Sequence, residues 1–177
     1  NRIGKQIMPF SAKAITAGTI TTLTDAHLRG RYSVLIFYPL DFTFVCPTEI
    51  TAFSDRIADF KKLNAEVLAC SVDSKFSHLA WINTPRNQGG LGKLENPLLA
   101  DLNKKIAADY GVLLDAGIAL RGLFIINPEG KVAYEVVHDL GIGRNVEEVL
   151  RVLEAIQTVQ KTGEVCPANW SKGGKTM

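Results

Sequence analysis

The chain has 177 residues, a length that fits one domain with a buried core. Hydrophobic residues make up 46% of it and charged residues 21%, which excludes a disordered or fibrous protein. The 20 basic residues exceed the 18 acidic ones too little to indicate a nucleic-acid partner, and no apolar run approaches the roughly 20 residues of a membrane-spanning helix.

The first predicted element is a strand from Tyr32 to Tyr38, an apolar and aromatic run between Gly30 and Pro39. A helix is expected to begin at Cys46 or Pro47, because proline suits a first helical position. The apolar residues that follow recur at helical spacing: Ile50, Phe53, Ile57, Phe60 and Leu63. The next two predicted elements are a strand over Glu66 to Val72 and a helix over Phe76 to Ile82.

The second half of the chain is predicted to hold a helix over Ala100 to Tyr110 and an antiparallel hairpin. The strands of that hairpin, Gly122 to Asn127 and Lys131 to Val137, flank the turn residues Pro128-Glu129-Gly130. The last helix begins after Asn145, which forms a capping pair with Glu148.

This order of elements predicts an α/β protein with a thioredoxin-like fold, in which helices flank a central mixed β-sheet. Periodicity stops after Gly163. We therefore expect one domain over residues 1–163 and a C-terminal tail over residues 164–177.

The three cysteines, Cys46, Cys70 and Cys166, are too few for the even disulfide framework of a small secreted domain. We expect a compartment that keeps thiols reduced, either the cytoplasm or the interior of an organelle such as a mitochondrion or plastid, and not secretion. Cys70 lies within an apolar strand pattern, which predicts a packed core thiol.

Cys46 is the candidate nucleophile because a helix N-terminus favours a thiolate. Ionising an ordinary thiol to about 90 per cent at pH 7 requires roughly 3.4 kcal/mol. A helix end supplies about 0.3 to 1 kcal/mol, and up to about 2 in good geometry. A cation is therefore also required, and Arg121 and Arg144 precede elements that could return to the same end of the sheet.

Several motifs resemble those of one family. Residues Pro39 to Cys46 read PLDFTFVC and match the PxxxTxxC active-site pattern, which Pro47-Thr48-Glu49 extends. From about Arg29 to Met177 the chain resembles the typical 2-Cys peroxiredoxins, whereas the first 28 residues match less well. The other matching segments are HLAW at 78–81, GGLG at 89–92, ALRGLFII at 119–126, GR at 143–144 and EVCPANW at 164–170.

The resemblance implies a thiol peroxidase that reduces hydrogen peroxide and alkyl hydroperoxides with neither a metal nor an organic cofactor. Cys46 would attack the peroxide and become a sulfenic acid. Thr43 would hold peroxide or thiolate, and Arg121 would stabilise the negative charge. Also among the catalytic residues, Pro39 would shield the sulfenate from water and Glu49 would orient Arg121 and Arg144. Arg144 and Trp81 would be supporting residues, and we expect Trp81 to contribute packing rather than chemistry.

The resemblance also implies a second thiol and a second subunit. Cys166 would attack the sulfenic acid of Cys46 to form a disulfide between the chains of a homodimer, and a thioredoxin-like protein would reduce it. The family also assembles five such dimers into a decamer. Phe42, Phe44 and Trp81 are predicted to be exposed apolar residues that could serve such contacts.

Other functions fit the sequence less well. A disulfide oxidoreductase would need a second cysteine at position 49, where this chain has Glu49. A Cys-His hydrolase or a zinc site would need a suitably placed histidine, and His27, His78 and His138 show no such context. A redox-regulated holdase chaperone is the alternative function that the sequence leaves open.

Overall fold

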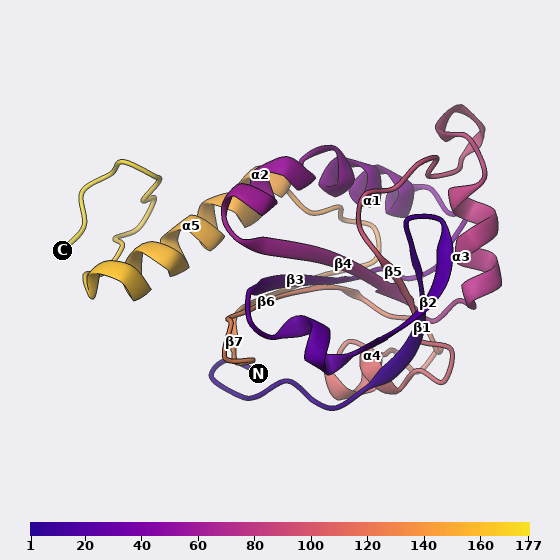
Figure 1. The fold of residues 1–177 in the computed structure, drawn as a ribbon, viewed down its shortest axis with the longest axis horizontal. Coiled ribbons are helices and arrows are strands. Elements are labelled where there is room, and N and C mark those ends of the chain that lie inside the picture. Colours follow the sequence, from indigo (N-terminus) through magenta and orange to yellow (C-terminus); the bar gives the residue numbers. More distant parts are fainter.

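The computed structural model describes residues 1–177 and consists of a seven-stranded mixed sheet with helices on both faces (Figure 1). The strands lie in the order β2-β1-β5-β4-β3-β6-β7. Strands β3, β4 and β5 are parallel to one another, and the remaining pairs are antiparallel. Their bounds are β1 Ser11–Thr16, β2 Thr19–Thr24, β3 Tyr32–Phe37, β4 Ala65–Ser71, β5 Leu98–Ala100, β6 Arg121–Ile126 and β7 Val132–His138.

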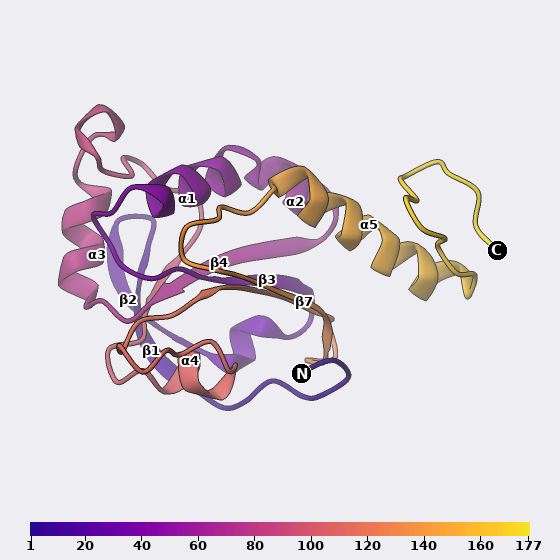
Figure 2. The same ribbon diagram turned by 180° about the vertical axis from the view of Figure 1, so that it is seen from behind.

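The helices divide the interior into two cores. Alternate residues of β3 illustrate the division, since Val34 and Ile36 belong to one core while Leu35 and Phe37 belong to the other. The first core lies under α1 (Val45–Asp55), α2 (Ile57–Lys62), α3 (Lys75–Ile82) and α5 (Val146–Thr162). The second lies under α4 (Lys105–Asp109), on the opposite face of the sheet (Figures 1 and 2).

Most of the predicted elements are confirmed. All six residues of β3 are buried, as a central strand requires. The hairpin pairs β6 with β7, and α5 has Asn145 as its N-cap, whose side chain accepts a hydrogen bond from the Glu148 amide. The helix expected from Cys46 begins one residue earlier, at Val45, and is divided into α1 and α2 at Arg56.

The helix predicted over Ala100 to Tyr110 is wrong at its N-terminal end. Ala100 ends strand β5, and Lys104 has a φ of 64°, a left-handed conformation that no helix interior accepts. The buried carboxylate of Asp101 then accepts hydrogen bonds from the amides of Ile106 and Ala107. These bonds satisfy the free amides of a helix that is limited to Lys105–Asp109.

The hairpin of β1 and β2 was not predicted. Its strands are joined by Ala17 and Gly18, both with positive φ, which is the backbone of a tight two-residue turn. Because an alanine at such a position is unusual, the turn gives a weak sequence signal.

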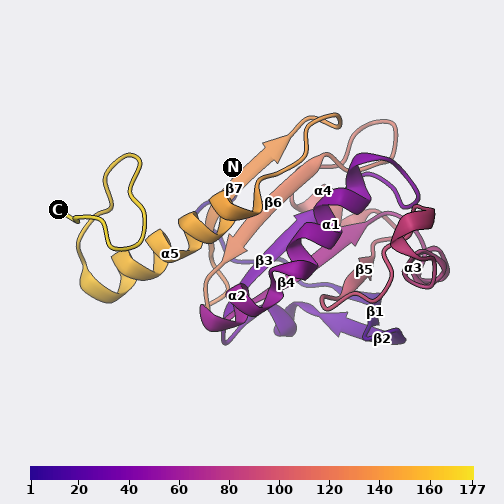
Figure 3. The ribbon, with the colours of Figure 1, turned by 90° about the horizontal axis from the view of Figure 1, so that it is seen from above.

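The last fourteen residues follow α5, whose C-cap is Gly163 in a left-handed conformation. Figure 3 shows this segment, in yellow, beyond the end of α5 and apart from α1 and the sheet. Reciprocal backbone hydrogen bonds between Val165 and Met177 close it into a loop. None of the helices combines the length and apolar character needed to cross a membrane.

Gly122, in β6, has no room for a side chain. A Cβ there would lie 2.6 Å from a methyl group of Val112 and 3.2 Å from the ring of Phe124. We expect Gly122→Ala to lower the free energy of unfolding by about 1 to 3 kcal/mol through overpacking, as measured by urea denaturation. Gly141→Ala, at a position with open space around it, is the control, and equal stability of the two variants would contradict this packing.

Candidate active site

Cys46 is fully buried and is the second residue of α1. The helix has Phe44 as its N-cap, and no side chain accepts a hydrogen bond from its first amides. Those amides and the positive end of the helix dipole therefore remain available to a negative charge near the sulfur.

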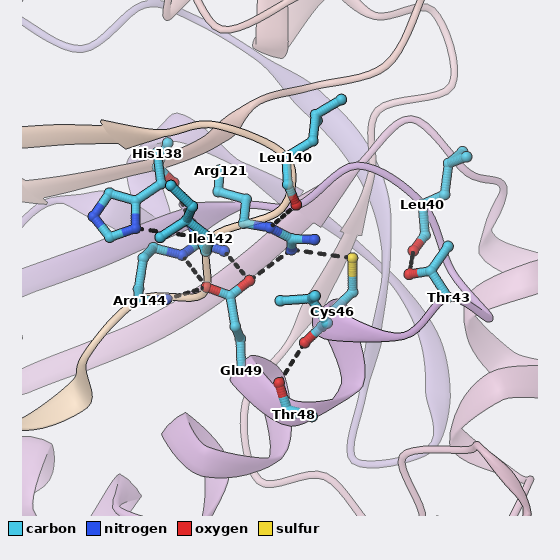
Figure 4. Close-up of polar contacts among 12 residues, drawn as sticks. Leu40, Thr43, Cys46, Thr48, Glu49, Arg121, His138, Leu140, Ile142 and Arg144 are labelled. Carbon is cyan, nitrogen blue, oxygen red and sulfur yellow. Dashed lines mark hydrogen bonds and ion pairs between the residues drawn. The ribbon is translucent and has the colours of Figure 1, made fainter.

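Arg121 reaches Cys46 because β6 is antiparallel to β3. The first residue of β6 therefore lies at the same end of the sheet as the last residue of β3, from which the chain leads to Cys46. Nη1 of Arg121 lies 3.2 Å from the Cys46 Sγ and donates to Glu49 Oε1 at 2.7 Å (Figure 4). Its Nε donates to the carbonyl oxygen of Leu140 at 2.7 Å, whereas Nη2 makes no hydrogen bond within the chain.

Glu49 lies one helical turn after Cys46 and its side chain is only 2% exposed. It also accepts hydrogen bonds from Arg144, through the backbone amide, Nε and Nη2. Burial by itself would raise the pKa of Glu49. The hydrogen bonds and charge of Arg144, together with the charge of Arg121, outweigh burial and hold that pKa below its ordinary value.

The buried cluster of Glu49, Arg121 and Arg144 carries one negative and two positive charges, and so has a surplus of one positive charge beside Cys46. Arg144 is held further by donating from Nη1 to the carbonyl oxygen of Gly122. An anion at the sulfur would neutralise the cluster, which is the arrangement that a buried charge requires.

Thr43 and Pro39 lie in the segment between β3 and α1. Figure 4 shows Cys46 between Thr43 and the Arg121–Glu49 pair. The Thr43 hydroxyl donates to the carbonyl oxygen of Leu40 at 3.0 Å, so its lone pairs can accept a hydrogen bond from another group. Pro39 is buried and lies two residues after the end of β3.

Cys166 does not lie with these residues. It belongs to the segment after α5, is partly buried, and its sulfur lies 3.8 Å from the carbonyl oxygen of Ala155. Cys70 is fully buried in β4, which confirms the predicted core thiol. Burial raises the pKa of Cys70 well above its ordinary value, and the negative charge of Asp101 raises it further.

The prediction that Trp81 is exposed is wrong. Its ring is fully buried between Tyr38 and Phe42, with ring centroids 5.8 and 5.9 Å away, and its Nε1 donates to the carbonyl oxygen of Gly89. Trp81 therefore packs beneath the segment that precedes α1. Phe42 and Phe44 are exposed as predicted, to 53% and 94%.

Two features near the site were missed by sequence reasoning. The carbonyl oxygens of Leu140 and Gly122 hold the arginines, but a main-chain contact has no residue-type signal. The second feature is a buried pair in which His78 Nδ1 lies 2.7 Å from Asp41 Oδ2. No histidine is hydrogen-bonded to Cys46, and no three acidic, histidine or cysteine side chains are grouped so that they could hold a metal ion.

Comparison with protein-family models gives two matches. Residues 3–135 match the AhpC/TSA family, and residues 155–177 match the C-terminal domain of 1-Cys peroxiredoxin. The second match includes Cys166.

Relatives and solved structures agree with the family models. The chain is 54% identical to Peroxiredoxin-2 of Bos taurus over 176 residues, which are 99% of this chain and 88% of the relative. It is 57% identical to the putative peroxiredoxin ycf42 of Pyropia yezoensis, covering 99% of this chain and 89% of that protein. The crystal structure of reduced Plasmodium vivax 2-Cys peroxiredoxin superposes with a TM-score of 0.97 at 44% identity, covering 100% of this chain and 93% of the other.

Glu49 gives a prediction about stability and pH. Glu49→Gln should lower the free energy of unfolding by about 3 to 5 kcal/mol at pH 7, because it leaves two buried guanidinium groups without their anion. A carboxyl whose folded-state pKa is depressed stabilises the fold above its unfolded pKa, which is near 4.5, and this contribution is lost as pH falls through the folded-state pKa.

The difference between wild type and Glu49→Gln should therefore shrink in urea titrations below about pH 4. Glu147→Gln is the control, since Glu147 also pairs with an arginine but is 72% exposed. An undiminished difference at low pH would contradict the assignment of the effect to the ionised carboxylate.

Proposed function

Because the chain belongs to the AhpC/TSA family of peroxiredoxins and is a thiol-dependent peroxidase, we propose that Cys46 is its peroxidatic nucleophile and Cys166 its resolving thiol. The observation that carries the assignment of Cys46 is the 3.2 Å contact between its sulfur and Arg121, within a buried cluster that has a surplus positive charge. The comparisons do not favour the alternative of a holdase chaperone.

In the first step, the Cys46 thiolate attacks one peroxide oxygen while the O–O bond breaks. The sulfur becomes a sulfenic acid, and the other oxygen leaves as hydroxide or alkoxide and takes up a proton to become water or an alcohol. Arg121 Nη2 is free to donate to the peroxide, and Nη1 stabilises the thiolate. Thr43 Oγ1 accepts a hydrogen bond from the O–H of the peroxide, because its own proton is donated to the carbonyl oxygen of Leu40.

Two further residues support this step. Glu49 orients Arg121 and Arg144 through the hydrogen bonds described above. These bonds restrict each arginine side chain to one conformation. Pro39, buried in the segment that leads from β3 to Cys46, shields the sulfenate from water.

In the second step, the Cys166 thiol attacks the sulfenic sulfur, forming a disulfide and releasing water. Cys166 contacts Ala155, which lies nine residues beyond Val146 and hence about 13 Å along α5 from the end anchored at the site by Arg144. A disulfide needs Cα atoms within about 7 Å, so this geometry favours pairing with Cys46 of a second chain. Two identical chains related by a two-fold axis can exchange their tails reciprocally.

Assembly beyond the dimer and recycling complete the proposal. The exposed rings of Phe42 and Phe44 offer apolar surface next to the site, which supports association of dimers into a decamer. A thioredoxin-like dithiol reduces the disulfide, its own thiols being oxidised in exchange. The few, unpaired cysteines support a reducing compartment, in the cytoplasm or inside an organelle.

Peroxide consumption in excess dithiothreitol tests the two thiol roles. Cys46→Ser should reduce consumption to the uncatalysed rate, because the nucleophile is lost. Cys166→Ser should still turn over, since dithiothreitol can attack the sulfenic acid directly. Cys70→Ala is the control and should behave as wild type. Unchanged consumption by Cys46→Ser would overturn the proposed nucleophile.

Mixing the Cys46→Ser and Cys166→Ser variants tests the pairing between subunits. After one equivalent of peroxide, a mixture of Cys46→Ser and Cys166→Ser chains that have exchanged subunits should give a covalent dimer on non-reducing electrophoresis. Only a mixed dimer holds one Cys46 opposite one Cys166. Cys46→Ser alone should give only the monomer band on the gel. Peptide mapping should identify the disulfide in the mixture as Cys46–Cys166. Absence of that cross-link in the mixture, with wild type forming an intrachain disulfide, would exclude pairing between subunits.

A further inference from the structure

His138 lies beside Arg121, although the two are separated by 17 positions in the sequence. They are directly paired in the antiparallel ladder of β6 and β7, which places their side chains on the same face of the sheet. His138 Nδ1 lies 3.2 Å from the carbonyl oxygen of Ile142 (Figure 4). A carbonyl oxygen only accepts, so Nδ1 carries the proton and donates.

This hydrogen bond closes the 139–144 loop, the segment that joins β7 to α5. Arg144 anchors the C-terminal end of the loop through its hydrogen bonds to Glu49 and the Gly122 carbonyl. The middle of the loop is held less firmly, because Ile142 is 59% exposed and Gly141 and Gly143 give the backbone wide freedom. Its internal hydrogen bonds otherwise run from the Ile142 amide to the Asp139 carbonyl and from the Leu140 amide to the Asp139 carboxylate. The His138 bond ties the Ile142 carbonyl, in the middle of the loop, to the last residue of β7.

The 139–144 loop holds Arg121 together with Glu49. The Leu140 carbonyl accepts a hydrogen bond from Arg121 Nε at 2.7 Å. Arg121 Nη1 contacts both the Glu49 carboxylate and the Cys46 sulfur. Because the guanidinium is planar, fixing Nε and Nη1 also fixes the direction of Nη2, the donor left free for the peroxide. A displacement of the Leu140 carbonyl by about 1 Å would swing that donor, and errors of this size cost up to about a hundredfold in rate.

We propose that His138 is a positioning residue for the peroxide step, holding the 139–144 loop so that the Leu140 carbonyl fixes the Arg121 guanidinium. The proposal rests on the function proposed above. His138 does not contact Cys46, so it acts through the loop and not on the reacting atoms.

Two substitutions separate the hydrogen bond from the imidazole itself. Asparagine at 138 carries an N–H donor at the same δ position, whereas leucine has a similar size and no donor. In stopped-flow single turnovers with hydrogen peroxide at pH 8, His138→Leu should lower the second-order rate constant of Cys46 oxidation about tenfold. His138→Asn should stay within about twofold of the wild-type rate constant. So should His27→Leu, which changes an exposed histidine that is distant from His138 in the sequence.

The second phase of the same reaction provides a readout that general loss of structure would not give. Disulfide formation by Cys166 does not use Arg121 Nη2, so its rate should be unchanged in His138→Leu. Urea denaturation of each variant checks that it is folded. If His138→Leu oxidises as fast as wild type, or if His138→Asn is as slow as His138→Leu, the positioning role is wrong.

A double-mutant cycle tests the route through Arg121. Lysine has no Nε–H for the Leu140 carbonyl to hold, so His138→Leu should cause no further loss in an Arg121→Lys background. An equal further loss in that background would overturn the proposal. Failure of the underlying function would look different, because Cys46→Ser would then consume peroxide as fast as wild type.

Discussion

The buried carboxylate of Glu49 is the interaction on which the rest of the site depends. It comes from the first turns of α1 and binds Arg121 from β6 and Arg144 from the segment before α5. Three elements that are distant in sequence are thereby fixed relative to one another. Because the carboxylate and both guanidinium groups are removed from water, each would be costly to bury without the others.

One surplus positive charge is the functional consequence of this arrangement. A single carboxylate neutralises only one of two arginines, so the cluster is electrostatically incomplete until an anion occupies the position of the Cys46 sulfur. The start of α1 and the Arg121 guanidinium both face the same atom, the Cys46 sulfur, which lies 3.2 Å from Arg121 Nη1. The fold thus supplies a buried, charged site from ordinary side chains.

The sequence predicted the fold class, the central strand, the hairpin and α5, because long apolar runs, turn residues and caps are local signals. It failed at Ala100–Lys104, where a strand pairing with β1 and β4 and a buried Asp101 cap override helical periodicity. It also placed Trp81 on the surface, because a lone tryptophan on a short helix does not reveal which neighbours cover it. Such outcomes depend on contacts between segments that no local pattern records.

By itself, the sequence determined which residues could perform the chemistry: a cysteine at a helix start, the PLDFTFVC motif around it, and arginines in strand and loop positions. Only the tertiary structure decided how they are arranged. The antiparallel pairing of β6 with β3 brings Arg121 to the Cys46 sulfur. The Leu140 carbonyl, a main-chain group that no side-chain pattern predicts, helps to orient the Arg121 guanidinium. The physical reason is that motifs specify side chains, whereas distances and hydrogen-bond directions arise from the packing of distant backbone segments.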